Sequence, residues 1–314
     1  MRVVVALGGN ALLERGETPL VEIQQKHVIA AVDALTPLAR DHDLVITHGN
    51  GPQVGLLALE SAQDRALPHA FPLDTLVAET QGMIGYFLLQ AFENALPGQQ
   101  VVGLITQTLV AADDPGFANP TKFVGPVYDE EESQRLARRW GWQVRRDGTA
   151  WRRVVASPEP QAIVELPTIR MLLADGAVVI CAGGGGVPVR QTTDGRLQGV
   201  EAVVDKDLVT ALLARDLEAD ALLLLTDVPA LEKDFGTPSA QPIRRITTAE
   251  LERLTFPAGS MGPKVEAARR FVQGTNRVAA IGRLQDAVEL LAGAAGTTIT
   301  DERDHRQESQ GEAS

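Results

Sequence analysis

The chain has 314 residues, 44% hydrophobic and 22% charged, which is enough for one large α/β domain or two smaller ones with a sizeable core. Its formal net charge of −12 argues against nucleic-acid binding by phosphate neutralisation, and no apolar run approaches the ~20 residues that a membrane span needs. The start MRVVVALGGN has the pattern of a strand rather than a signal peptide, and the single cysteine, Cys181, cannot form an intramolecular disulfide. We therefore expect a cytoplasmic protein.

Short apolar runs alternate with longer helical patterns along the chain. We expect helices over about 17–41 and 74–95, and another that begins near Pro52, because proline suits the first turn of a helix. We expect strands over the apolar segments 3–7, 44–47, 101–106, 177–181, 221–226, 277–281 and 297–300. Apolar runs of this length, separated by helices, are typical of a parallel sheet that helices cover on both faces.

Residues about 113–160 break this alternation. They contain a turn-rich stretch, a charged helical segment (DEEESQRLARRW) and all three tryptophans of the chain, Trp140, Trp142 and Trp151. Because insertions of this length tend to be functional, we interpret it as a small lid or subdomain. The polar residues 301–314 lack a periodic apolar face, and we expect them to form a disordered tail.

Three expected strands run directly into glycine-containing loops. These loops are Gly8-Gly9-Asn10, Gly49-Asn50-Gly51 and Gly183 to Gly186. The carboxyl ends of parallel strands meet at the edge where open α/β sheets bind their ligands. Glycine lets the backbone approach a ligand and turn its N–H groups toward an anion. Three such loops therefore predict a phosphate or small-anion site, although tight turns alone remain an alternative.

Several well-known motifs are absent from the sequence. It has no G-x-x-x-x-G-K-[ST] P-loop and no G-x-G-x-x-G that opens a helix after the first strand. The histidines lack the spacing of metal ligands, so we predict no metal-binding residues in the chain. We expect His48 to hold its loop by hydrogen bonds rather than act as a base, and Cys181 to be a core residue.

Lysine is rare in this chain, with five residues against 24 arginines. Two of the five, Lys206 and Lys264, lie in the first turn of an expected helix, where Asp205 and Pro263 mark the helix starts. A cation there opposes the helix dipole by about 0.3–1 kcal/mol, which brings no structural gain. The placement is favourable if an anion occupies the site. Asp207 could orient the lysine side chains.

Lys122 lies within the insertion, in Asn119-Pro120-Thr121-Lys122, and its spacing allows two interpretations: a surface charge, or a lid group that closes over a phosphate. Lys26 and Lys233 lie in ordinary polar surroundings, and we expect them to be solvated. Together the glycine loops and lysines suit phosphoryl transfer without a covalent enzyme intermediate. Mg²⁺ would bridge the nucleotide phosphates and would need few protein ligands.

A series of short motifs covers almost the whole chain from 1 to 300. They are ALGGNAL (6–12), HGNGPQVG (48–55), PLDTLVAETQGMIGY (72–86), NPTKFVGP (119–126), WRRVVASPEP (151–160), GGGGVPV (183–189), GVEAVVDKDL (199–208), LLTDV (224–228) and GSMGPKVEAA (259–268). In these motifs the chain resembles the carbamate kinases of the amino-acid kinase superfamily. NPTK, DKD and M-x-P-K in combination separate that family from acetylglutamate, aspartate and uridylate kinases.

The resemblance implies a three-layer αβα sandwich around a mostly parallel open sheet of about eight strands, with a small protruding lid subdomain, in a homodimer. It implies that residues 1–200 form the carbamate-binding lobe, with the lid subdomain at about 113–160, and that residues 201–300 form the nucleotide-binding lobe. The implied reaction is reversible phosphoryl transfer between ATP and carbamate, with Mg²⁺, giving ADP and carbamoyl phosphate. Such enzymes often run toward ATP synthesis during arginine or purine-derivative breakdown.

The resemblance also implies roles for individual residues. Lys206 and Lys264 would stabilise the transferred phosphoryl group, Lys122 would close over it from the lid, and Asp207 would organise the lysines. The residues that would hold carbamate and phosphate are Gly8, Gly9, Asn10, Gly49, Asn50 and Gly51. Those that would lie along the nucleotide, together with Lys206 and Lys264, are Thr226, Asp227 and Val228.

The residues by themselves indicate only an anion-binding α/β enzyme of the phosphotransferase type, and two alternatives to carbamate kinase stay open. The first is a kinase for another small carboxylate, although the sequence lacks an obvious arginine-bearing pocket for a second carboxylate. The second is a catalytically inactive nucleotide-binding regulator, although all three central lysines are present. Ala150, where the family commonly has glycine, and Pro229, with its following loop, depart from the family pattern.

Overall fold

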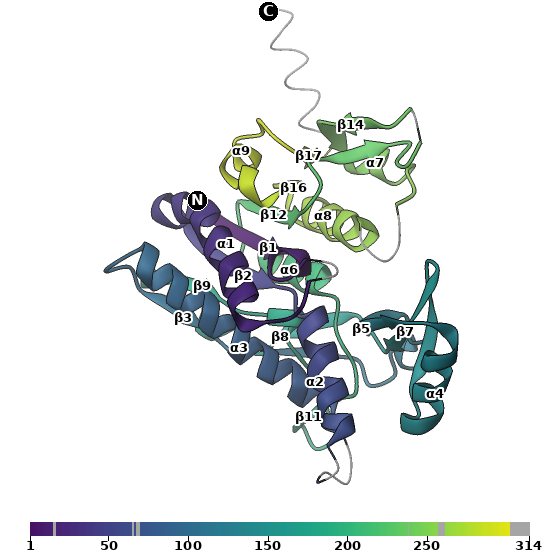
Figure 1. The fold of residues 1–314 in the computed structure, drawn as a ribbon. Helices are drawn as coiled ribbons and strands as arrows, with labels where there is room; N and C mark the ends of the chain where they lie inside the picture. The colour runs from purple at the N-terminus through teal and green to yellow at the C-terminus, as the bar shows by residue number, and fades with distance from the viewer. Residues whose placement is uncertain (15–16, 65, 67–69, 238, 257–260, 302–314) are drawn as a thin grey trace, which may run out of the picture.

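An open sheet of eight strands forms the centre of the computed structural model, which describes residues 1–314 except 15–16, 65, 67–69, 238, 257–260 and 302–314 (Figure 1). From one edge to the other the strands are β15 (Arg245–Thr247), β17 (Thr297–Thr300), β16 (Val278–Arg283), β12 (Ala221–Thr226), β1 (Arg2–Leu7), β2 (Asp43–His48), β9 (Val178–Ile180) and β3 (Val101–Gly103). The sheet is mostly parallel, as expected, since within it only β16 and β17 pair antiparallel.

Helices cover both faces of this sheet. One face carries α1 (Val21–Asp41), α3 (Leu73–Ala95) and α9 (Ala287–Leu291), and the other carries α5 (Leu166–Ala174), α6 (Lys206–Asp216), α7 (Thr248–Leu251) and α8 (Met261–Thr275). The side chains of β1 alternate between the two faces: Val3 and Val5 pack under α1 and α3, whereas Val4 packs toward α6. The three-layer αβα sandwich is therefore confirmed.

Most predicted elements are confirmed with small shifts of their ends. Helix α1 begins at Val21 rather than near residue 17, and α2 (Gly51–Gln63) carries Pro52 in its first turn. The strand predicted over 101–106 is only partly right, because β3 ends at Gly103. The short strand β15 was not predicted. Residues 302–314 of the expected tail lie outside the described residues, and none of the described helices is long and apolar enough to cross a membrane.

Two smaller sheets that the sequence did not predict flank the main one. A four-stranded sheet has the order β11 (Leu197–Gly199), β10 (Val187–Gln191), β4 (Gln107–Val110) and β8 (Pro160–Ile163). An antiparallel pair consists of β13 (Leu231–Lys233) and β14 (Gln241–Ile243). One-turn 3₁₀ helices occupy Gly9–Ala11, Pro115–Phe117, Gly183–Gly185 and Leu284–Asp286.

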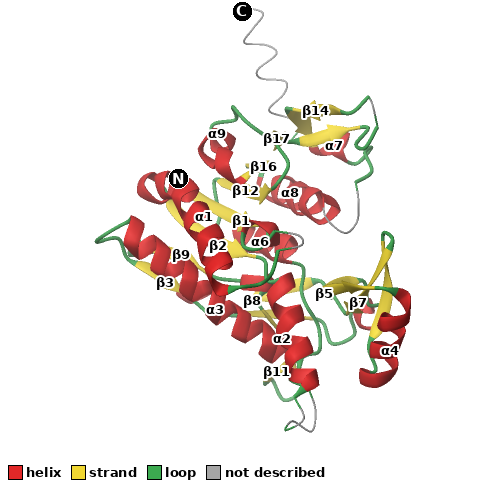
Figure 2. Ribbon diagram, viewed as in Figure 1, coloured by secondary structure: helices red, strands yellow, loops and turns green. Residues whose placement is uncertain are grey.

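The insertion at 113–160 contains a small sheet with its own helix, here called the protruding subdomain. Its sheet has the order β5 (Lys122–Tyr128), β7 (Ala150–Val155) and β6 (Gln143–Asp147), and the helix is α4 (Glu130–Trp140). Figures 1 and 2 show it projecting from the side of the molecule. It lies against α2 where Gly55 meets Gly125: a Cβ atom on Gly55 would lie 2.0 Å from the Gly125 Cα.

Candidate active site

The carboxyl ends of the neighbouring strands β12, β1, β2 and β9 meet at one edge of the main sheet. The loop after β1 brings Gly9 against the loop after β2, since a Cβ atom on Gly49 would lie 2.9 Å from the Gly9 backbone nitrogen. The loops after β1 and β2 therefore meet at one edge of the sheet, as predicted.

The glycine run after β9 packs into the same place. A Cβ atom on Gly183 would lie 2.4 Å from the His48 ring, and one on Gly185 would lie 2.5 Å from the carbonyl oxygen of Val204. Gly185 also has a positive φ of 90°, which L side chains rarely adopt. The run is thus required to bring the loop against the residues that precede α6.

His48 is buried behind these loops and cannot serve as a base toward a ligand. Its Nδ1 lies 3.1 Å from the carbonyl oxygen of Gly49. Burial, assisted by the nearby Lys206 ammonium, lowers the pKa of His48 to about 4, so the ring is neutral at physiological pH. This fits the predicted role of holding the loop.

Helix α6 begins directly at the site. The Asp205 side chain caps it, as predicted, because its Oδ1 accepts hydrogen bonds from the backbone N–H groups of Asp207 at 2.9 Å and Leu208 at 3.4 Å. The cap makes Lys206 the first residue of the helix. The Lys206 side chain is 12% exposed and donates from Nζ to Asp207 Oδ1 at 2.6 Å.

Lys264 reaches the same carboxylate from the neighbouring helix α8. Its Nζ donates to Asp207 Oδ2 at 3.0 Å and to Oδ1 at 3.3 Å, and its side chain is 11% exposed. Two lysines from separate parts of the chain therefore converge on Asp207, whose side chain is 7% exposed. This is the arrangement that their placement at helix N-termini predicted.

The electrostatics of this trio favour a charged Asp207. Burial alone would raise the pKa of Asp207, but the ammonium groups of Lys206 and Lys264 lower it well below its usual range. The pKa of Lys206 is lowered to about 8, chiefly by burial and also by the Lys264 ammonium, while Asp207 opposes the shift. Lys206 therefore loses its proton more readily than an ordinary lysine.

Lys122 enters the site from strand β5 of the protruding subdomain. Its Nζ donates to Asp205 Oδ2 at 2.5 Å, and its side chain is 33% exposed. Burial alone would lower the pKa of Lys122, but the Asp205 carboxylate outweighs it and raises that pKa. The ammonium is therefore held charged beside α6, where Lys122 lines the cleft described below, while its role as a lid group that closes over a phosphate stays a prediction.

Lys122, Asp205, Asp207 and Lys264 line a cleft of about 1010 Å³, whereas Lys206, which donates to Asp207, is not among its lining residues. The lining also includes Gly8, Gly9, Thr226, Asp227 and Val228. Around Asp205 and Asp207, three ammonium groups face two carboxylates, while the carboxylates of Glu14, Asp227, Glu232 and Asp286 lie elsewhere in the lining. The cleft therefore suits an elongated ligand with a negatively charged group beside the lysines.

Not every predicted residue lines the cleft. Asn50 is buried, with its Nδ2 donating to Thr80 Oγ1 at 2.9 Å, and Gly49 lies behind Gly9. The side chain of Asn10 lies outside the described part of the structure. The roles of Gly49, Asn50 and Gly51 toward a substrate stay predictions.

Sequence reasoning missed several residues that line the cleft. They are Glu14, His27, Glu232, Phe235, Phe256, Met261, Arg283 and Asp286. The strand-end rule could have found Arg283, which ends β16 beside β12. Nothing in the local sequence marks Phe235 or Phe256, which come from loops.

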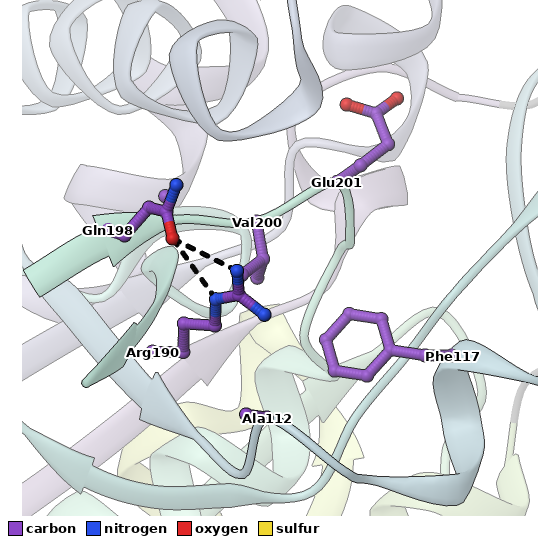
Figure 3. Close-up of a pocket in the computed structure, with 7 residues that line it drawn as sticks. Ala112, Phe117, Arg190, Gln198, Val200 and Glu201 are labelled. Carbon is purple, nitrogen blue, oxygen red and sulfur yellow. Dashed lines mark hydrogen bonds between the residues drawn. The ribbon is translucent and has the colours of Figure 1, made fainter. Parts of the chain in front are cut away.

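A second, smaller cavity of about 310 Å³ lies beside the β10–β11 hairpin and contains none of the predicted site residues (Figure 3). Arg190 lies on its wall and donates from Nε and Nη2 to Gln198 Oε1 at 3.2 and 3.0 Å. Cys181 is buried in the core as predicted, and burial raises its pKa to about 12. Within the described ranges no group of three or more His, Cys, Asp or Glu side chains could hold a metal ion.

Comparison with known proteins links this cleft to one family. A profile described as the amino acid kinase family matches residues 1–282. The chain is 53% identical over 303 residues to a carbamate kinase of Rhizobium meliloti (strain 1021), and this alignment covers 96% of this chain and 93% of the relative. It is 50% identical over 298 residues to a carbamate kinase of Escherichia coli (strain K12), covering 95% and 99%.

A solved structure agrees with the sequence comparison. The carbamate kinase from Giardia lamblia bound to AMP-PNP superimposes with a TM-score of 0.87 at 39% identity, covering 96% of this chain and 98% of that one. The similarity extends over nearly the full length of both chains, so it includes both sides of the cleft.

Proposed function

The chain belongs to the amino acid kinase family, among its carbamate kinases, and from this we propose that it transfers a phosphoryl group reversibly between ATP and carbamate, giving ADP and carbamoyl phosphate. The observation that carries the proposal is the convergence of Lys206 and Lys264 on the buried Asp207, which lines the same cleft as Gly8 and Gly9. Such a pair of ammonium groups suits a transition state that spreads negative charge over the transferred group.

The proposed roles of the lysines follow from where their ammonium groups lie. Lys206 and Lys264 would stabilise the phosphoryl oxygens as charge redistributes during transfer, and Asp207 would hold both lysines in place. Lys122 would approach from the protruding subdomain and help to exclude water. Because carbamate is already an anion, the reaction needs no general base, which is consistent with the neutral, buried His48.

The two ends of the cleft suggest how the substrates divide between them. We propose that carbamate and the transferred phosphoryl lie near Gly8 and Gly9, in the lobe formed by residues 1–200. The nucleotide would extend along Thr226, Asp227 and Val228, in the lobe formed by 201–300. The apolar side chains of Phe235 and Phe256 on that side would suit an aromatic base.

We propose that Mg²⁺ enters with the nucleotide. Mg²⁺ keeps several waters and usually combines substrate phosphates with one or two carboxylates, and Asp227 and Asp286 offer carboxylates along the cleft. When bound, the ion would neutralise charge on the nucleotide phosphates. A homodimer in the cytoplasm is also proposed, on the resemblance to the family.

A coupled assay with carbamoyl phosphate and Mg-ADP tests the proposal. Wild-type protein should form ATP, and Lys206→Ala and Lys264→Ala should each reduce kcat by about 100-fold or more, because each removes a charge from the transition state. Lys233→Ala, at an exposed lysine, is the matched control and should retain full activity. Wild-type turnover in both Lys206→Ala and Lys264→Ala would rule out the assigned roles.

A further inference from the structure

The two carboxylate oxygens of Asp205 serve two different parts of the molecule. Oδ1 caps α6 through the N–H groups of Asp207 and Leu208, while Oδ2 accepts the 2.5 Å hydrogen bond from Lys122 of the protruding subdomain. We propose that Asp205 is a positioning residue that holds Lys122 over the cleft beside the start of α6. The proposal rests on the proposed function, in which Lys122 assists phosphoryl transfer.

The capping role alone does not account for an aspartate at this position. A cap needs one acceptor oxygen, and Asn or Ser provides it about as well as Asp. The second oxygen of Asp205 is directed to a lysine 83 residues away, on strand β5 of the protruding subdomain. The side chain of Asp205 is only 12% exposed, so its negative charge is poorly solvated and favours a cationic partner.

Among the described residues, each other ion pair between the protruding subdomain and the rest of the molecule has a carboxylate that is about half exposed. Arg153, which is 14% exposed, pairs with Glu201, which is 56% exposed, and Glu159 pairs with Arg270, both close to half exposed. Exposed pairs contribute little to a fixed geometry because water screens them and both side chains lose entropy. The partly buried pair with Asp205 is therefore best placed to set where Lys122 lies.

Holding Lys122 in this way does not prevent it from binding a substrate. A lysine ammonium has three N–H donors, and Asp205 accepts from one of them. Two donors stay available for phosphoryl oxygens, so Lys122 could keep its partner while a ligand binds. Asp205 would then pre-position the lysine rather than compete with the substrate for it.

The substitution Asp205→Asn separates positioning from capping. Its Oδ1 can still cap α6, but its NH₂ group then faces the Lys122 ammonium, so the attraction is lost. We expect the KM for carbamoyl phosphate to rise about five-fold, which corresponds to the largest free energies usually measured for exposed ion pairs. We expect kcat to change less than about two-fold, because bound substrate itself attracts Lys122.

Two results in this assay would overturn the proposal. A lower KM would mean that Asp205 competes with the substrate, and a lower kcat at unchanged KM would mean that it only maintains α6. The matched control is Asp129→Asn, since Asp129 caps α4 through the N–H of Glu132 at 2.8 Å, and its KM should equal that of the wild type.

A double-mutant comparison tests whether Asp205 acts through Lys122. In a Lys122→Met background, Asp205→Asn should leave KM unchanged, because the partner of the carboxylate is already gone. The same five-fold rise in both backgrounds would show that Asp205 acts independently of Lys122 and would refute the positioning role.

Tryptophan fluorescence gives a readout that does not depend on activity. All three tryptophans lie in the protruding subdomain, and Trp142 stacks with Arg153, which pairs with Glu201 outside it. Asp205→Asn and Lys122→Met should increase acrylamide quenching alike, and Asp129→Asn should not. Quenching that equals the wild type in both variants would overturn the proposal. Absence of wild-type ATP formation would instead refute the proposed function, while the quenching data would still test the contact.

Discussion

Two carboxylates at the start of α6, Asp205 and Asp207, lie two residues apart and bind lysines in different ways. Asp207 receives Lys206 from its own helix and Lys264 from α8, both well buried, on helices that pack together under the main sheet. Asp205 receives a single lysine, Lys122, which is one-third exposed and comes from the protruding subdomain.

The two arrangements differ in attachment, because Lys206 and Lys264 belong to helices of the main sheet whereas Lys122 belongs to the protruding subdomain. Fixed ammonium groups stabilise a transition state without the cost of reorganising during the reaction. Lys122 instead depends on the contact of its subdomain with Asp205 for its position. The start of α6 therefore carries both kinds of lysine contact two residues apart, and the following experiments bear on this contrast.

The largest effect is expected when the fixed arrangement loses its carboxylate. Asp207→Ala would leave two buried ammonium groups without a counter-ion, so the free energy of unfolding should fall by about 3–5 kcal/mol. The kcat for ATP formation should fall by about 100-fold or more, since both lysines lose their orientation. Urea unfolding and the coupled assay measure the two quantities.

The control for this experiment lies at the other end of the same helix. Asp216 pairs with the half-exposed Arg215, so Asp216→Ala should change the free energy of unfolding by less than about 1 kcal/mol. An equal fall in the free energy of unfolding for Asp207→Ala and Asp216→Ala would show that burying Asp207 with its two lysines has no particular effect on stability.

The next effect concerns pH. Because burial and Lys264 lower the pKa of Lys206 to about 8, kcat/KM should fall about tenfold per pH unit above that value as the ammonium loses its proton. Bound phosphate stabilises the charged form, so the corresponding limb of kcat should lie at higher pH. Lys233→Ala should show the wild-type profile, and a kcat/KM that is level up to pH ~10 would contradict the prediction.

The same pKa has a distinct consequence for stability. From about 8 up to 10.5, the ordinary value of lysine, the unfolded chain binds the Lys206 proton more tightly than the folded protein does. The contribution of Lys206 to the free energy of unfolding therefore rises with pH across this window. Activity should be lost there without a loss of stability from this group, which urea unfolding at several pH values can measure.

The smallest effect is expected at the contact between α2 and the protruding subdomain. Gly55→Ala would place a Cβ atom 2.0 Å from the Gly125 Cα, so the subdomain must shift. We expect the KM for carbamoyl phosphate to rise about three-fold and the free energy of unfolding to fall by about 1–3 kcal/mol.

A glycine in open space provides the control for Gly55. A Cβ atom on Gly82 in α3 would have no neighbouring atom within 4 Å, so Gly82→Ala should raise the free energy of unfolding by about 0.5–1 kcal/mol through better helix propensity. If Gly55→Ala behaved like Gly82→Ala, the close contact would not constrain the subdomain.

The main sheet could be predicted from the sequence because its strands are long apolar runs. Two of the missed strands lack that signal: β15 is three residues long with an exposed arginine, and all three residues of β11 are exposed. Their existence depends on pairing with distant segments, such as β17 for β15, rather than on local pattern.

The sequence could identify those site residues whose charge is unfavourable at their place in a helix. Lys206 and Lys264 oppose a helix dipole, and that conflict identified both. The second role of Asp205 could not be found in this way, because a capping aspartate is locally satisfied and its contact with Lys122 forms only in three dimensions.

The pairing of β1 with β12 at the centre of the sheet has a consequence for how the chain is made. At synthesis rates of about 5–20 residues per second, β1 would leave the ribosome roughly 10–40 seconds before β12 is available. Until then one edge of the apolar β1 segment lacks its native partner, even when β2 covers the other edge. During this interval the unpaired edge of β1 could therefore pair with a strand of another chain.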